Sequence, residues 1–127
     1  MNGRFVTMAG NPAVASYTKH KKHFTYLTLT PEQESALVAE AEKWAVKRVA
    51  VTKVSHDEYG DHTDTETSLT RLTDFHGDIV VRNGRIYAAV NDHGIIRKDR
   101  AVVTKLERWE PRTVEYITYT FTLVRVD

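Results

Sequence analysis

The chain has 127 residues, of which 41% are hydrophobic and 28% are charged, as is usual for one globular domain with a single core. A formal net charge of +1 at pH 7 provides no global field that would attract nucleic acid or a membrane. The absence of cysteine excludes disulfides, thiolate metal sites and cysteine nucleophiles.

Residues 1–19 are small and polar and are interrupted by Gly10 and Pro12, so we predict a flexible N-terminal arm there. The same breakers argue against a signal peptide, and no apolar run approaches the roughly 18–20 residues of a transmembrane helix. We therefore expect a soluble protein made inside the cell, without membrane contact, whose single α+β domain covers residues 20–127.

A strand followed by a helix is predicted at the start of this domain. Residues 23–30 (HFTYLTLT) alternate and are rich in aromatic and β-branched residues, as strands are. Thr30 then suits a helix N-cap, Pro31 the first helical position and Gln33 the third position of a capping box. The predicted helix covers residues 31–47 and has an apolar face with Trp44 as its main anchor: Leu37, Ala41, Trp44 and Ala45.

The rest of the chain is predicted to be β structure. The Asn83-Gly84 pair between two apolar runs is a strong signal for a tight hairpin. The last strand has one face with Ile117 and Phe121 and another rich in threonine. The predicted strands are 48–54, 67–75, a hairpin within 77–92, 100–109 and 113–126. We expect an α+β fold in which about six strands form a mostly antiparallel, curled sheet, as a barrel or a sandwich, with one amphipathic helix near residues 31–47.

The acidic stretch SHDEYGDHTDTE, residues 55–66, raises the question of a metal or acid–base site. Imidazole and carboxylate groups are good ligands for zinc, manganese or iron, but their spacing here matches no rigid template. We therefore interpret the stretch as a solvated hairpin loop, and keep a metal-dependent enzyme centred on residues 56–66 and a docking loop as alternatives. The candidate ligands are His56, Asp57, Asp61, His62, Asp64 and Glu66. Because no catalytic signature occurs elsewhere, we expect no enzymatic activity and no cofactor.

Two groups of basic residues are the candidate partner-binding sites. In the TKHKKHFTY stretch, Lys19, Lys21 and Lys22 precede aromatic residues, a combination that suits a phosphate backbone and stacked bases. Lysines at a strand edge also prevent unwanted pairing, which is the simpler interpretation. A tight hairpin places Arg82 opposite Arg85, an arrangement that costs stability unless both side chains reach water or an acidic partner. The next connection adds two further cations, Arg97 and Lys98.

The segment VAVTKVS at residues 49–55, the DEYGD that follows at 57–61, the hairpin GDIVVRNGRIYAAV at 77–90 and the final LVRVD carry a family resemblance. From residue 48 onward the chain resembles the small β-barrel proteins that close the head–tail junction of long-tailed bacteriophages. The resemblance implies a ring-forming virion protein without catalytic residues, whose loops contact neighbouring rings and whose interior faces passing DNA.

We therefore expect a non-enzymatic bacteriophage structural protein of the head–tail connector or tail-completion region. Its partners would be further copies in a ring and neighbouring virion proteins, with possible contact to DNA. The alternative is a small phage-encoded binding protein that inhibits a host defence or nucleic-acid complex. Steeply salt-dependent binding would favour that alternative.

Overall fold

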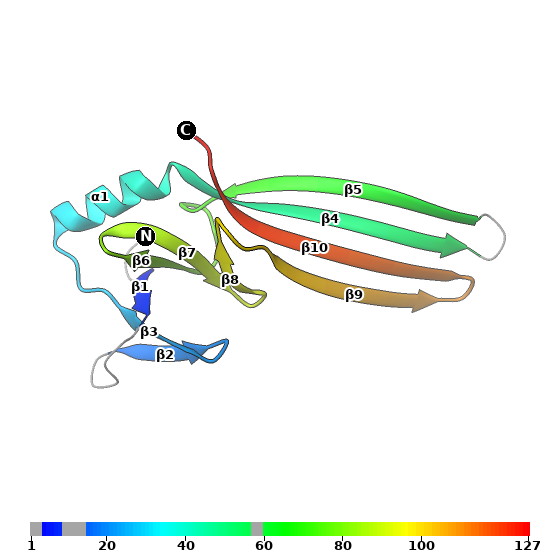
Figure 1. The fold of residues 1–127 in the computed structure, drawn as a ribbon, viewed down its shortest axis with the longest axis horizontal. Helices are drawn as coiled ribbons and strands as arrows, with labels where there is room; N and C mark the ends of the chain where they lie inside the picture. The colour runs from blue at the N-terminus through cyan, green and yellow to red at the C-terminus, as the bar shows by residue number, and fades with distance from the viewer. Residues whose placement is uncertain (1–3, 9–14, 57–59) are drawn as a thin grey trace.

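The computed structural model describes residues 4–8, 15–56 and 60–127, which form a head and a long sheet that projects from it (Figure 1). The head contains one helix and six strands, and four longer strands make the second sheet. In chain order the elements are β1 (Phe5–Met8), β2 (Ser16–Lys19), β3 (Lys22–Tyr26), α1 (Pro31–Ala41), β4 (Trp44–His56), β5 (Gly60–Arg71), β6 (Asp78–Arg82), β7 (Arg85–Asn91), β8 (Gly94–Arg97), β9 (Val102–Glu110) and β10 (Thr113–Arg125).

The head sheet has the strand order β2-β3-β1-β6-β7-β8. All of its neighbours are antiparallel except β1 and β6, which run parallel with Phe5 opposite Ile79. The prediction of an irregular arm over residues 1–19 is therefore wrong for the described parts of that segment. Phe5 and Val6 are buried in the middle of the sheet. Burial of an aromatic and a β-branched side chain is favourable, and it offsets the cost of ordering this short segment.

The predicted helix start is confirmed. The Thr30 hydroxyl accepts a hydrogen bond from the Gln33 amide, and the Gln33 side chain accepts one from the Thr30 amide, which completes the capping box. The predicted end at residue 47 is wrong, because α1 ends at Ala41 and Trp44 begins β4. Trp44 is nevertheless buried at the helix end, where its Nε1 donates to Glu40 Oε1 at 3.2 Å.

The second sheet has the order β5-β4-β10-β9, and all its pairs are antiparallel. β4 and β5 pair from Ala45–Arg71 to His56–Gly60, so most of the acidic stretch at 55–66 is paired strand. The loop predicted over that stretch is thus wrong outside residues 57–59, which are not among the described residues. Threonines 63, 65 and 67 alternate with the charged residues there, and this alternation suits a strand with a polar face.

Most of the core lies between α1, the inner face of the head sheet and the bases of β4 and β10. It combines Phe5, Leu37, Trp44, Leu72, Ile79, Ile96, Phe121 and Leu123 with smaller apolar residues. A smaller cluster on the other face of the head sheet contains Val6, Phe24, Val80, Ala88 and Val90. The Tyr17 ring stacks on Phe24 at 5.3 Å between centroids, and its hydroxyl donates to the Asp78 carboxylate.

The curled sheet expected from the sequence is present, but neither sheet closes into a barrel. The described residues make ten strands in two sheets, where about six strands were predicted. Within the described ranges, no helix is long and apolar enough to cross a membrane.

Gly77 gives a direct test of this packing. A Cβ at this position would lie 2.2 Å from the Val90 carbonyl oxygen and 2.7 Å from the Phe75 ring, while the Gly77 carbonyl accepts two hydrogen bonds from Arg4. We predict that Gly77→Ala lowers the free energy of unfolding by about 2 kcal/mol or more, because backbone must shift. Gly84→Ala is the matched control, since its Cβ meets open space and only the positive φ of 73° is strained, at about 1 kcal/mol. Equal urea midpoints for the two variants would contradict the packing around Gly77.

Candidate interaction site

Members of the two predicted groups of basic residues, Lys22 and Arg97, meet at one edge of the head. The β2–β3 connection is a tight turn in which His20 and Lys21 have positive φ values of 53° and 62°. This turn contacts the β7–β8 turn: His20 Nε2 donates to the Asn91 carbonyl oxygen at 2.9 Å, and Lys19 Nζ lies 2.9 Å from Asp92 Oδ1. The ion pair with Lys19 holds the pKa of Asp92 below its usual range. These contacts join segments about 70 residues apart in the chain and hold the curl of the sheet.

A hollow of about 490 Å³ lies beside this contact, and we call it the basic hollow. Its lining combines His20, Lys22, Arg97 and Arg100 with apolar residues that include Ile95. Asp99 lies 3.9 Å from Arg97, whereas Lys22 and Arg100 form no ion pair within the described ranges. An open, positively charged hollow of this kind can accept a phosphate or a carboxylate.

Tyr87 links the basic hollow to the β6–β7 hairpin. Arg97 Nη1 donates to the Tyr87 hydroxyl at 3.1 Å, and the Arg82 guanidinium lies 5.4 Å from the Tyr87 ring centroid. The hydrogen bond from Arg97 lowers the pKa of the Tyr87 phenol and raises that of the guanidinium. Arg82 and Arg85 do pair across the hairpin, as predicted, and the Tyr87 ring gives the Arg82 guanidinium a favourable contact.

This linkage predicts a pH effect. Because the pKa of Tyr87 is lower in the folded protein than in the unfolded chain, the stability that it contributes is present at high pH and is lost as the pH falls through the folded value. In an alkaline titration followed by tyrosinate absorbance, we expect one tyrosine to ionise at a lower pH than the others. Arg97→Gln should remove that early phase, and Tyr87→Phe should remove the tyrosine itself. An early phase that survives both substitutions would assign it to another tyrosine.

The other predicted residues lie elsewhere on the head. The Lys98 ammonium is 5.9 Å from the Trp44 ring centroid, Lys21 is exposed at the β2–β3 turn, and Arg85 faces α1 across a second hollow. The structure thus places Lys19, Lys22 and Arg97 together, connects Arg82 to them through Tyr87, and separates the rest.

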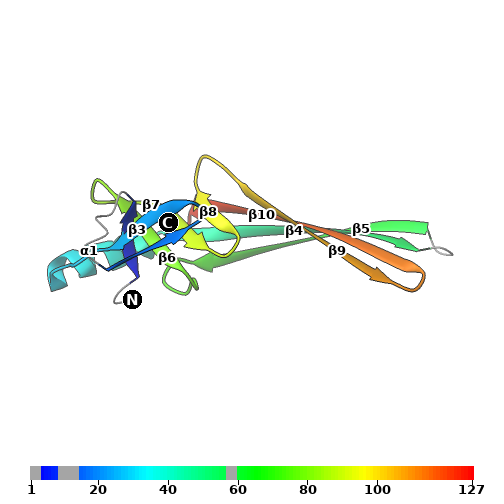
Figure 2. The same ribbon diagram turned by 90° about the horizontal axis from the view of Figure 1, so that it is seen from below.

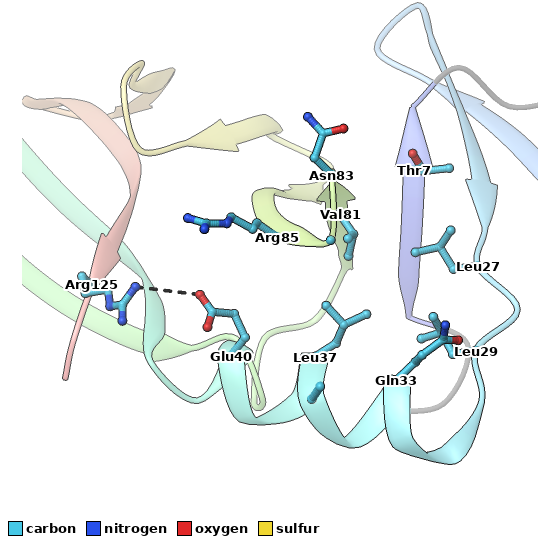
Figure 3. A pocket seen from close by; sticks show the side chains of 12 residues that line it. Thr7, Leu27, Leu29, Gln33, Leu37, Glu40, Val81, Asn83, Arg85 and Arg125 are labelled. Carbon is cyan, nitrogen blue, oxygen red and sulfur yellow. Dashed lines mark ion pairs between the residues drawn. The ribbon is translucent and has the colours of Figure 1, made fainter.

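The second hollow, which we call the apolar groove, has a volume of about 780 Å³ and lies between α1 and the tip of the β6–β7 hairpin (Figure 3). Leu27, Leu29, Leu37 and Val81 line it, and Glu40 and Arg125 form an ion pair of 3.8 Å at one side. Sequence reasoning missed this groove, because its lining comes from several separated parts of the chain. The alternation of Leu27 and Leu29 just after β3 was the available signal.

The third candidate surface is the outer part of the four-stranded sheet, which we call the projection: residues 49–56, 60–67, 103–110 and 113–120. It extends well beyond the head as a single twisted layer, and beyond Tyr119, which packs against the main core cluster at the base, no described segment covers either face (Figures 1 and 2). Its few buried side chains, Ala50, Val54 and Ile117, belong to neither core cluster. No local sequence pattern predicted this extension.

The projection and its base expose several large apolar side chains. Trp109 is 71% exposed and Leu69 is 58% exposed. The other exposed ones there are Val103, Leu106 and Tyr116. Exposed apolar groups on an otherwise polar surface are typical of sites that contact another macromolecule.

Of the residues proposed as metal ligands, His56, Asp61 and His62 lie near the tip of the projection, and Asp64 and Glu66 lie further along β5 toward the head. His56 and His62 come from paired strands, and their rings stack at 5.4 Å between centroids. Among the described residues, no group of three or more histidine, aspartate or glutamate side chains is placed to hold a metal ion. Asp57 lies outside the described residues.

These features define a mostly β protein with one helix, a curled six-stranded sheet and a projecting four-stranded sheet. Comparison of the chain with protein-family models, curated protein sequences and solved structures found no match.

Proposed function

We propose that the protein is a non-enzymatic structural component of a bacteriophage particle, in the head–tail connector or tail-completion region. In this proposal it acts through contacts between its own copies, arranged as a ring, and with neighbouring virion proteins. The virion assignment rests on the resemblance that begins at residue 48, and the assembly role rests on the projection.

The projection carries the argument for assembly. A single sheet layer that extends beyond the core adds little to the stability of the head, and it exposes backbone and apolar surface that a monomer does not need. Such an element is useful when a second molecule covers it. Trp109 illustrates this, because a tryptophan in a protein contact buries a large area and loses little conformational entropy.

Size-exclusion chromatography with light scattering tests the proposal. The full chain should form oligomers of defined mass at micromolar concentration, and electron microscopy of that fraction should show rings. A monomer at all concentrations, also in mixtures with purified connector and tail proteins of the same phage, would overturn the proposal.

The basic hollow favours a second candidate function, binding to phosphate groups of nucleic acid or of a nucleic-acid complex. Its support is the convergence of Lys22, Arg97 and Arg100 on one concave site. A fluorescently labelled DNA duplex should then bind with an affinity that falls steeply with salt concentration. Lys22→Glu should weaken that binding, whereas Lys47→Glu, on the second sheet, should leave it unchanged. Binding that is equal for both variants and insensitive to salt would contradict this candidate.

A further inference from the structure

We infer that neighbouring copies join edge to edge, with β5 of one copy pairing antiparallel with β9 of the next. In the register that we infer, Asp64 lies opposite Arg108 and Leu69 lies opposite Val103. This inference rests on the proposed function, since it names the surface through which the copies would assemble.

The first observation is that the projecting sheet has two long open edges. β5 spans 12 residues and pairs only with β4, and β9 spans nine residues and pairs only with β10, within the part of the chain that the structure describes. All of β5 except Ser68 is exposed. The outward-facing amides and carbonyls of such strands are a template for pairing with another strand. Short edges are the usual protection against this, and these edges are not short.

The second observation is the direction of the two edge strands. β9 runs from the head toward the tip of the projection, and β5 runs from the tip back to the head (Figure 1). When two copies lie side by side with their projections pointing the same way, β5 of one and β9 of the other are therefore antiparallel. A contact between two different edges leaves a free edge on each copy, so further copies can be added by the same rotation. The copies form a closed ring when a whole number of these rotations makes a full turn.

The third observation is that the two edges complement each other in one register. The strand pairing places Asp64, Thr52, Ile117 and Leu106 in one row across the sheet, so Asp64 and Arg108 are on the same face. When Asp64 of one copy pairs with Arg108 of the next, His62 also lies opposite Glu110 on that face. On the other face this pairing sets Leu69 against Val103, which are 58% and 54% exposed. Within one copy Asp64 lies in the same row as Leu106, so pairing with Arg108 of the next copy shifts that copy by two residues along the strand direction. A sheet that closes on itself needs such a stagger between its strands.

Pairing of two β5 edges is disfavoured in registers that oppose their carboxylates. An antiparallel pair of two β5 strands centred on Asp64 would bring that carboxylate against its copy, with His62 against Glu66. Moving the centre to Thr65 sets Asp64 against Glu66. Carboxylates directly opposite each other across a strand pair are destabilising. Asp64 and Arg108 form no ion pair within the described ranges, so each is available for a partner in the next copy.

Disulfide trapping tests the register directly, because the natural chain contains no cysteine. Within one copy, β5 and β9 are separated by three interstrand spacings, about 14 Å, which exceeds the reach of a disulfide. The double variant Leu69→Cys with Val103→Cys should therefore crosslink only between copies, and mild oxidation should produce a ladder of covalent oligomers. The matched control, Leu69→Cys with Glu107→Cys, moves the second cysteine four residues along the same face and should produce little crosslinking.

Charge reversal gives an independent measurement. Asp64→Arg alone and Arg108→Asp alone should each raise the concentration at half-assembly by about tenfold, and the double reversal should restore assembly. Urea midpoints of the single variants, taken at a concentration where the chain is monomeric, should match that of the natural chain, since both side chains are exposed.

The outcomes separate the inference from the proposed function. Oligomers of the natural chain that give no ladder with the 69/103 pair, or covalent dimers from Leu69→Cys alone, would overturn edge pairing and leave the proposed function in place. A natural chain that stays monomeric would overturn both.

Discussion

Removing the outer part of the projection is expected to abolish assembly and leave the head folded. In this variant Asn-Gly replaces residues 51–65 and a second Asn-Gly replaces residues 105–118. Both turns then connect residues that already face each other, Ala50 with Glu66 and Thr104 with Tyr119. The removed strands contribute no side chain to either core cluster, so the core of the head stays intact.

The measurements are light scattering for mass and thermal unfolding for the head. We expect a monomer at concentrations where the natural chain is oligomeric, together with a cooperative unfolding transition. The control is Lys21→Ala in the natural chain, at the exposed β2–β3 turn on the head, which should leave the mass unchanged. A shortened variant that still assembles would move the assembly surface to the head.

Phe121→Ala is expected to be the most destabilising single substitution discussed here. The Phe121 side chain is 6% exposed, belongs to the main core cluster and stacks on His93 with 4.7 Å between ring centroids. It joins β10 to the β7–β8 turn and so connects the two sheets. Truncation to alanine should cost about 3–5 kcal/mol, because it removes buried apolar surface and leaves a cavity.

Tyr116→Ala on the same strand is the matched control, because Tyr116 faces the opposite side and is 45% exposed. Its effect on the free energy of unfolding should lie within about 0.5 kcal/mol. Urea unfolding should be followed in the Asp64→Arg background, so that assembly does not add to the measured stability. Similar losses for both variants would show that Phe121 does not connect the sheets in the way described.

Local signals predicted the local structure well. The Thr30–Gln33 capping box starts α1, Asn83-Gly84 makes a tight hairpin with positive φ at both residues, and the two faces of β10 are as predicted. The predicted helix end was wrong because Trp44 and Ala45 continue the helical spacing of Leu37 and Ala41 in the sequence. In the structure they pair with β10 and β5, so tertiary contacts make them part of a strand. The strand at Phe5–Met8 was missed because it is only four residues long and its parallel neighbour, β6, is far from it in sequence.

The interaction surfaces were less predictable than the elements. The basic character of Lys22 and Arg97 was visible in the sequence, but their approach to each other depends on the curl of the head sheet. The projection depends on how far the head covers β4 and β10, which no local pattern reports. Alternation along β5 and β9 identifies them as strands, yet it does not distinguish a covered sheet from an open one.

We propose that this protein assembles through the projecting sheet. Amide hydrogen exchange tests it most directly, with the natural chain measured at a concentration where it is monomeric and at one where it is assembled. We predict that exchange slows on assembly in residues 60–71 and 102–110, whose outward amides gain strand partners. Unchanged exchange in both strands, with new protection confined to the basic hollow or the apolar groove of the head, would contradict the claim.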